Sequence, residues 1–167
     1  LNNWDVSKVT NMNRLFFGAS RFNGNISNWD TNSVTTMEFM FKLALNFNQD
    51  LNGWNVKNVT SMEGMFAQAM TFNTPLDKWD TSNVENMTEM FTQASRFDQN
   101  IGTWNIENVT NLSHMFDNAV FFNQNLENWD TSSVINMKEM FNNQRDFNQD
   151  ISGWNVSNVT DMSYMFK

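Results

Sequence analysis

The sequence contains no cysteine, one histidine and one proline among its 167 residues. Without cysteine, the chain can form neither a disulfide nor a thiolate metal site. Ten basic residues stand against 18 acidic ones, which gives a net charge of -8. The basic residues are also scattered along the chain, so we expect neither nucleic acid nor an anionic membrane as a partner. No apolar run approaches the length of a membrane-spanning helix, and we expect no direct membrane insertion.

What the sequence does contain is a strict repeat. Tryptophan recurs every 25 residues without any insertion, at Trp4, Trp29, Trp54, Trp79, Trp104, Trp129 and Trp154. A fixed period of this length is typical of a repeat protein, so we number the columns of the repeat from 1, at tryptophan, to 25. We predict that residues 1–167 form a single repeat domain. Because the chain begins and ends inside a repeat, we expect this domain to be part of a longer array.

Several apolar columns follow the same period. Valine occupies column 6, methionine or leucine columns 9 and 12, phenylalanine columns 13 and 19, alanine column 16, and isoleucine or leucine column 23. Gln144 is the exception in column 16. Of the 13 methionines and 16 phenylalanines, all but Met70 and three phenylalanines lie in these columns. We therefore interpret these side chains as core ladders rather than as a cofactor site or a methionine-rich metal site.

The spacing of the core columns predicts the fold class. Columns 9, 12, 13 and 16 have the i, i+3, i+4, i+7 spacing of one helix face, and Thr35–Glu38 and Thr60–Glu63 match capping boxes. We expect a short helix from about column 7 or 8 to about column 16 or 17. Columns 1 to 3 alternate in the manner of a short strand. One strand and one helix per coil predict a right-handed α/β solenoid of the leucine-rich-repeat type, with six to seven coils and parallel strands ~4.8 Å apart.

Column 2 is a candidate ligand face. Its residues are Asp5, Asp30, Asn55, Asp80, Asn105, Asp130 and Asn155. From the second repeat on, Asp and Asn alternate, which suggests a 50-residue unit and amide-to-carboxylate hydrogen bonds between stacked coils. Two interpretations stay open for this acidic, amide-rich face. It either binds a basic or polyhydroxylated ligand, or it is a solvated sheet face whose amides stack on one another.

The repeat reads Ile/Leu-x-x-Trp-Asp/Asn-Val/Thr-x-x-Val-x-x-Met-x-x-Met-Phe, followed by Phe-Asn-Gln, and residues 154–166 contain most of this motif. It resembles the BspA-like leucine-rich-repeat surface proteins over essentially the whole chain. Departures are few: Leu15 and Leu112 replace methionine, and Pro75 enters one turn. The resemblance implies a leucine-rich-repeat-like solenoid, a secreted or cell-surface location, and adhesion to host or matrix proteins or to neighbouring cells. It implies no shared catalytic residues.

Catalytic and metal chemistry find little support in the sequence. The single histidine, His114, lies in column 11, where the other repeats carry unrelated residues, so we interpret it as a surface residue. No second histidine or cysteine is present to build a catalytic triad, and we expect no enzymatic activity, no cofactor and no metal. Turn residues Asp50, Asp98 and Asp150 could hold calcium. The glycine-rich pattern of calcium-binding solenoids is missing, however, so hydrogen bonds to turn backbone are the favoured interpretation.

The leading functional hypothesis is a non-catalytic extracellular or cell-surface module that binds protein. Four aromatic residues outside the core columns are possible contact residues: Phe17, Phe39, Phe121 and Tyr164. The alternative is a structural element whose uncapped end coils expose methionine and phenylalanine. Such coils would associate with further copies of the chain, end to end.

Overall fold

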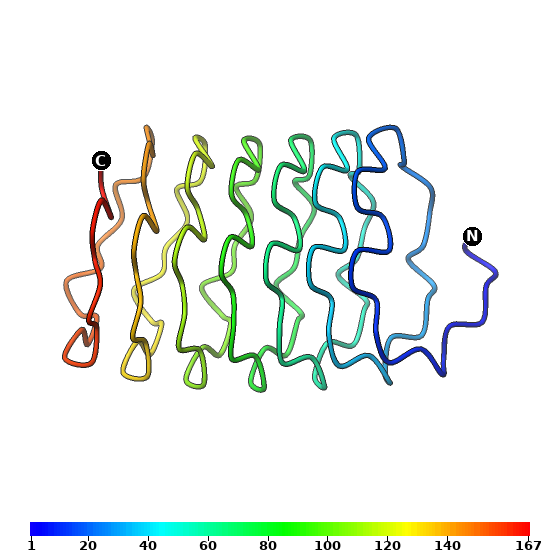
Figure 1. Ribbon diagram of the computed structural model, residues 1–167, viewed down its shortest axis with the longest axis horizontal. Helices are drawn as coiled ribbons and strands as arrows, with labels where there is room; N and C mark the ends of the chain where they lie inside the picture. Colours follow the sequence, from blue (N-terminus) through cyan, green and yellow to red (C-terminus); the bar gives the residue numbers. More distant parts are fainter.

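The computed structural model describes all of residues 1–167 as one row of stacked coils, with the two termini at opposite ends of the row (Figure 1). Six isolated parallel β-bridges join column 8 of each coil to column 8 of the next, from Asn11–Thr36 to Asn136–Asp161. The chain contains no helix and no strand longer than these single bridges. The predicted α/β solenoid, with one strand and one helix in each coil, is therefore wrong. Nothing in the structure qualifies as a membrane-spanning helix.

Turns and contacts between coils take the place of the expected helix. All 73 backbone–backbone hydrogen bonds lie outside helices and strands. Across columns 11 to 16 the N–H groups alternate between two directions. Phe66 N–H donates to the Met90 carbonyl oxygen of the next coil at 2.9 Å, whereas Ala67 N–H donates to the Gly64 carbonyl oxygen of its own coil at 3.1 Å. Backbone groups that would otherwise be buried without a partner are paired in this way.

Positive φ angles explain why no helix forms. Every residue of columns 11 and 15 has a positive φ: Arg14, Gly18, Phe39, Leu43, Gly64, Gln68, Glu89, Gln93, His114, Asn118, Glu139, Asn143 and Tyr164. A positive φ at the third residue of a turn defines type II, and a right-handed helix contains no such residue. The predicted capping boxes are absent too. The Thr35 hydroxyl instead donates to the Thr10 carbonyl oxygen of the preceding coil at 3.1 Å.

Two neighbouring glycine substitutions should distinguish this turn ladder from a helix. Gln68 has a φ of 60°, which costs an L-residue roughly 1–2 kcal/mol. Glycine avoids this cost but loses about 0.5–1 kcal/mol of backbone entropy. Gln68→Gly should therefore raise the free energy of unfolding by about 0.5–1 kcal/mol, whereas Ala67→Gly should lower it by about 1 kcal/mol. Denaturant unfolding measures both values. In a helix both variants would be less stable than the parent chain.

The predicted core ladders are confirmed. Forty-five buried apolar residues form one cluster that runs through the stack. Rings of column 13 lie parallel in successive coils, with the Phe41 and Phe66 centroids 5.5 Å apart. Indoles stack as well, at 6.1 Å between Trp79 and Trp104. From Trp29 onward, every indole N–H donates to the column 23 carbonyl oxygen that lies 28 residues earlier in the chain, at 2.9 to 3.2 Å. Each tryptophan is thus fixed by its neighbours rather than by its own coil.

A polar ladder flanks this core in column 20. Its members are Asn23, Asn48, Asn73, Asp98, Asn123 and Asn148. The Oδ1 atom of each of the first five accepts the backbone N–H of the same column in the next coil, at 2.8 to 3.0 Å. These side chains connect neighbouring coils by hydrogen bonds in a region that has no β-strand.

The 50-residue period is expressed in column 3. Even-numbered coils carry a buried threonine there, and odd-numbered coils carry valine or isoleucine. The hydroxyls of Thr31, Thr81 and Thr131 donate to the column 2 carbonyl oxygen of the next coil, at 2.8 to 2.9 Å. A pair of coils is therefore the true structural unit at this edge of the stack.

Candidate functional site

Column 2, the predicted ligand face, is exposed in every coil. One side-chain oxygen of each member accepts the backbone N–H two residues further on, at 2.9 to 3.2 Å. Asn55 Nδ2 also donates to Asn32 Oδ1 of the preceding coil. The amide-to-carboxylate ladder expected within column 2 is therefore replaced by turns that each residue closes in its own coil.

Three aspartates of this column have perturbed acidities. The Ser82 hydroxyl lies 2.6 Å from Asp80 Oδ1, and this hydrogen bond, together with that of the Ser82 N–H, holds the pKa of Asp80 below its ordinary value. Hydrogen bonds from Ser7 and Ser132 lower the pKa values of Asp5 and Asp130 in the same way. The charged form of each carboxylate is the one that closes the turn.

Acid should therefore weaken these turns. Because the folded-state pKa lies below the unfolded value of about 3.9, the stabilisation is complete above pH 4 and is lost as the pH falls through the folded pKa. A chain carrying Asp5→Asn, Asp80→Asn and Asp130→Asn should show a flatter fall of melting temperature between about pH 4 and pH 2. At pH 7 it should melt like the parent, since asparagine closes the same turn at Asn105. Equal slopes for the two chains would contradict this account.

The four predicted contact aromatics lie in different places. Phe17 is 46% exposed. The guanidinium carbon of Arg14 lies 5.8 Å from the ring centroid of Phe17 and 5.3 Å from that of Phe39, so Arg14 contacts both rings. Phe39 itself is only half-exposed, because its ring covers Gly64. A Cβ atom on Gly64 would lie 2.6 Å from Phe39 Cε1. Tyr164, in the last coil, lies under the Lys167 ammonium at 5.0 Å.

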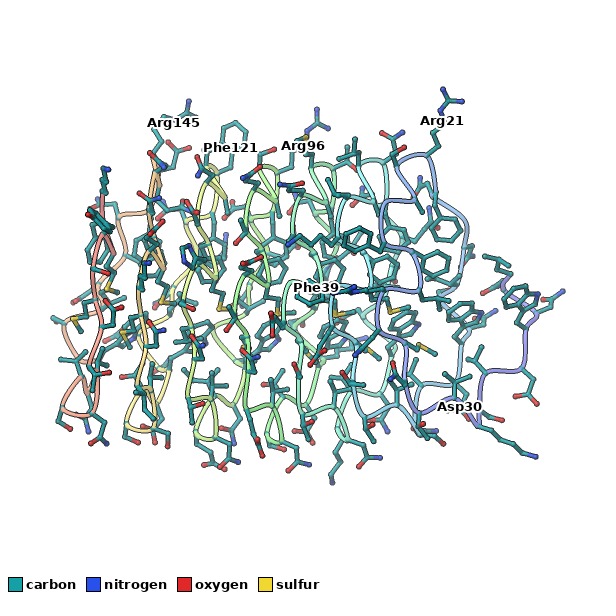
Figure 2. The ribbon with its side chains drawn as sticks, in the orientation of Figure 1. Arg21, Asp30, Phe39, Arg96, Phe121 and Arg145 are labelled. Atoms are coloured by element: carbon teal, nitrogen blue, oxygen red, sulfur yellow. The ribbon has the colours of Figure 1, made fainter.

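Phe121 belongs to a different edge of the stack, formed by columns 17 and 18 and called here the arginine edge. Its most exposed large members are Arg21, Met70, Arg96, Phe121 and Arg145. Figure 2 shows Arg21, Arg96, Phe121 and Arg145 along the upper border, with Asp30 of column 2 near the lower border. Three of the four arginines, Arg21, Arg96 and Arg145, thus lie along one edge of the stack, and column 2 lies at another.

Arg145 and Phe121 form one unit on this edge. The guanidinium of Arg145 lies 5.2 Å from the Phe121 ring centroid, and its Nε donates to Asp146 Oδ1 at 3.0 Å. This hydrogen bond raises the pKa of Arg145 and lowers that of Asp146. Below them lies an open depression lined by Asn73, Arg96, Asp98, Phe121, Asn123 and Asp146. Its floor includes members of the column 20 ladder, so its shape is set by the coil stack.

The turns considered for calcium use their oxygens internally. Asp50 Oδ1 and Asp150 Oδ1 each accept the N–H of the residue two positions on. Asp98 Oδ1 accepts both Asn123 N–H and the Gln124 side-chain amide. These carboxylates lie in separate coils; Asp50 and Asp150 close their own turns, whereas Asp98 joins its coil to the next.

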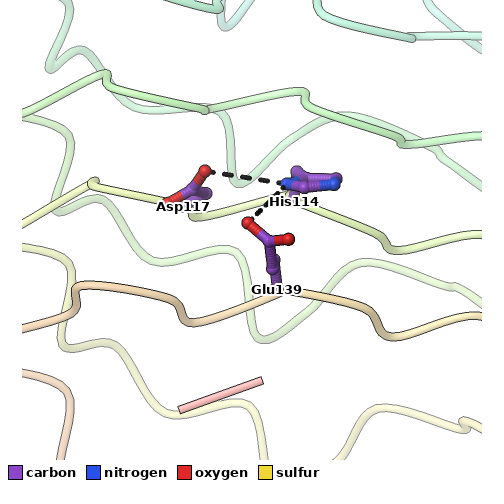
Figure 3. A group of neighbouring side chains, drawn as sticks. All are labelled: His114, Asp117 and Glu139. Atoms are coloured by element: carbon purple, nitrogen blue, oxygen red, sulfur yellow. Dashed lines mark ion pairs between the residues drawn. The ribbon is translucent and has the colours of Figure 1, made fainter. Parts of the chain in front are cut away.

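A second cluster lies on the face formed by columns 11 and 14. His114 Nδ1 lies 3.6 Å from Asp117 Oδ2 and 3.5 Å from Glu139 Oε2 (Figure 3). His114 and Glu139 are neighbours in column 11 of successive coils, and Asp117 follows His114 by three residues. All three side chains are half-buried, at 27%, 14% and 22% exposure. Asn142 lies beside them and donates to both carboxylates.

Comparison with known families covers the whole chain. The family model described as "Mycoplasma protein of unknown function, DUF285" matches twice, over residues 1–104 and 90–167. The chain belongs to this family. No curated protein and no solved structure matches it. Two consecutive matches agree with the tandem repeat seen in the sequence, and the description of the family assigns no activity.

Sequence reasoning about this DUF285 chain missed two groups of residues. It did not single out Arg96 and Arg145, which flank Phe121 on the arginine edge, nor the partners of His114. A signal for the second group was present. His114 and Glu139 occupy the same column 25 residues apart, and residues of one column are spatial neighbours in a stack of coils.

Proposed function

We propose that this DUF285 chain is a non-catalytic module that binds a protein partner through the arginine edge. The observation that carries the proposal is the side-by-side exposure of arginine and phenylalanine there, since Phe121 is 46% exposed beneath Arg145. Arginine and aromatic residues are enriched at protein interfaces, arginine also among the few residues that carry most of the binding energy. The buried columns repeat almost unchanged, whereas columns 17 and 18 differ from coil to coil, as expected of a surface fitted to a partner.

The arginine edge suits a partner better than column 2 does. One oxygen of every column 2 side chain is already engaged by backbone, whereas Arg96 and Phe121 line an open depression. A side chain of the partner could enter this depression and contact the aromatic ring. Asp98 and Asp146, which also line the depression, would add polar selectivity.

We further propose an extracellular or cell-surface location and a role in adhesion to host, matrix or neighbouring-cell proteins. The support is the resemblance of the repeat motif to that of BspA-like leucine-rich-repeat surface proteins. The absence of cysteine is compatible with this location, because the stack is held by hydrogen bonds and ring stacking and requires no disulfide.

Binding to immobilised collagen, fibronectin and laminin, measured by biolayer interferometry, tests the proposal. We expect the chain to bind at least one of them. Phe121→Ala combined with Arg96→Ala should weaken that binding by about tenfold or more, as expected when interface anchors are removed.

The chain offers a matched control in its other exposed phenylalanine–arginine pair, Phe17→Ala with Arg14→Ala. This double variant should bind like the parent chain. Equal losses in the two double variants, or no binding to any of the three matrix proteins, would reject the proposal.

End-to-end assembly is a second candidate for this 167-residue chain. Its support is that the coils pack on one another through repeated ring stacking, such as that of Trp79 on Trp104 at 6.1 Å, which a coil of a second copy can make in the same way. Native mass spectrometry discriminates between the two candidates, because a discrete monomer contradicts assembly and a ladder of oligomers supports it.

A further inference from the structure

We propose that His114, Asp117, Glu139 and Asn142 bind one divalent transition-metal ion, with zinc as the best match. One imidazole nitrogen and two carboxylate oxygens are borderline donors that zinc accepts readily. The potential ligand atoms of His114, Asp117 and Glu139 all lie within 4.8 Å of one another. The site lies on the face of columns 11 and 14 (Figure 3) and shares no residue with the arginine edge of columns 17 and 18.

The distances fit a metal polyhedron. Zinc binds nitrogen and oxygen donors at about 2.0 to 2.2 Å, so two ligands in a tetrahedral arrangement lie roughly 3.4 Å apart. His114 Nδ1 lies 3.6 Å from Asp117 Oδ2 and 3.5 Å from Glu139 Oε2. Both separations are longer than an ordinary charge-assisted hydrogen bond of about 2.8 Å. A central cation therefore fits this spacing better than direct imidazole–carboxylate hydrogen bonds do.

Asn142 provides an independent observation. Asn142 is only 8% exposed. Its Nδ2 atom faces the cluster and lies 3.0 Å from Asp117 Oδ1 and 3.3 Å from Glu139 Oε2. Its Oδ1 atom is buried without any hydrogen-bond partner. Buried acceptors without a partner are rare. With a cation between the carboxylates, the amide can rotate by half a turn and place Oδ1 on the metal as a fourth ligand.

The charge balance of the cluster also favours a cation. Two carboxylates lie together, and the nearest lysine ammonium, that of Lys138, reaches only Glu139 Oε1, at 3.8 Å. Asp117 is surrounded by amide donors from Asn118 and Asn142, which compensate charge only in part. A divalent ion would neutralise both carboxylates at once.

The backbone holds the ligands in place before any ion binds. His114 and Glu139 both have positive φ, 57° and 53°, so they leave their coils in the same manner. His114 N–H donates to the Lys138 carbonyl oxygen at 2.8 Å, which fixes the register of the two coils directly beside the cluster. Such a rigid frame lowers the ordering cost of metal binding.

Isothermal titration calorimetry of the metal-free chain with zinc, and optical titration with cobalt(II), test the proposal. We expect one ion per chain and the intense visible absorption of a four-coordinate cobalt site. His114→Ala and Glu139→Gln should each weaken zinc binding by at least tenfold and abolish the cobalt bands, whereas the distant exposed Glu127→Gln should leave both unchanged. If His114→Ala does not fold, His114→Arg replaces it, because Arg14 occupies column 11 in another coil.

The Asn142→Asp variant provides a second test, because the proposal predicts opposite changes of its melting temperature without and with zinc. It places a third carboxylate in the cluster, so this variant should melt below the parent chain in chelator and gain more melting temperature from zinc than the parent does. Magnesium should shift neither chain, because it disfavours imidazole donors. Zinc binding that is equal in the parent and in His114→Ala, or the absence of stoichiometric binding, would overturn the assignment. The cluster would then be an ion-pair network only.

Discussion

Replacing Phe91 with alanine should lower the free energy of unfolding by about 3 to 5 kcal/mol. The ring is completely buried in a central coil, and its centroid lies 3.9 Å from that of Phe97. It also stacks on Phe66 and Phe116 of the two neighbouring coils, at 5.6 and 5.9 Å. The cavity left by alanine would therefore interrupt a column on both sides. Denaturant unfolding followed by tryptophan fluorescence measures the change.

The last member of the same column is the matched control. Phe166 is 62% exposed and stacks only on Phe141, at 5.6 Å. Phe166→Ala should cost about 1 kcal/mol, because the side chain buries little area and leaves no enclosed cavity. Similar losses for Phe91→Ala and Phe166→Ala would show that stability does not come from contacts between coils.

A deletion of two whole coils should be tolerated better than a smaller deletion that breaks the period. Removal of residues 54–103 joins Gly53 to Trp104, which preserves every column and the alternation of threonine and valine in column 3. The product should unfold cooperatively, with a lower melting temperature because it has fewer coil–coil contacts. Removal of residues 54–91 joins column 25 to column 14. This variant keeps more residues than the first, but the columns on the two sides of the junction no longer match, so the core columns are interrupted there.

We expect the variant lacking residues 54–91 to be several kcal/mol less stable than the one lacking residues 54–103, or to be unfolded, since each coil is stable only between its neighbours. Circular dichroism at 222 nm is uninformative for a chain without helices. Near-ultraviolet circular dichroism, which reports the stacked indoles, and thermal melting are the measurements of choice. The opposite order of stability would contradict a stack built from 25-residue coils.

The turn ladder also explains how function can vary on a constant scaffold. Inward columns must keep their rings and thioethers, because each side chain packs on its own copy in the next coil. Side chains in the outward columns 11, 14 and 18 need not pack on a copy of themselves, so these columns can vary. Arg14, His114, Glu139 and Phe121 lie in columns 11 and 18. Both the arginine edge and the proposed metal site consist of side chains that depart from the repeat consensus, while the backbone repeats unchanged.

The sequence by itself determined the period, the core and the order of the stack. Because tryptophan, phenylalanine and methionine recur in fixed columns, their burial followed from periodicity alone, and the structure places them as expected. The position of His114 beside Glu139 was also implied, since residues 25 apart in one column must be neighbours. Its closeness to Asp117 and Asn142 was not, because that depends on how each turn directs its side chains.

Only the tertiary structure decided that the coils are built from turns. The i, i+3, i+4, i+7 spacing that predicted a helix is equally compatible with two successive type II turns, which also direct columns 9, 12, 13 and 16 inward. The choice depends on backbone hydrogen bonds to the next coil, such as that from Phe66 to Met90. An isolated 25-residue segment cannot form these bonds. In the stack they stabilise positive φ at residues such as Gln68 and Glu89, which a local reading of the sequence assigns to a helix.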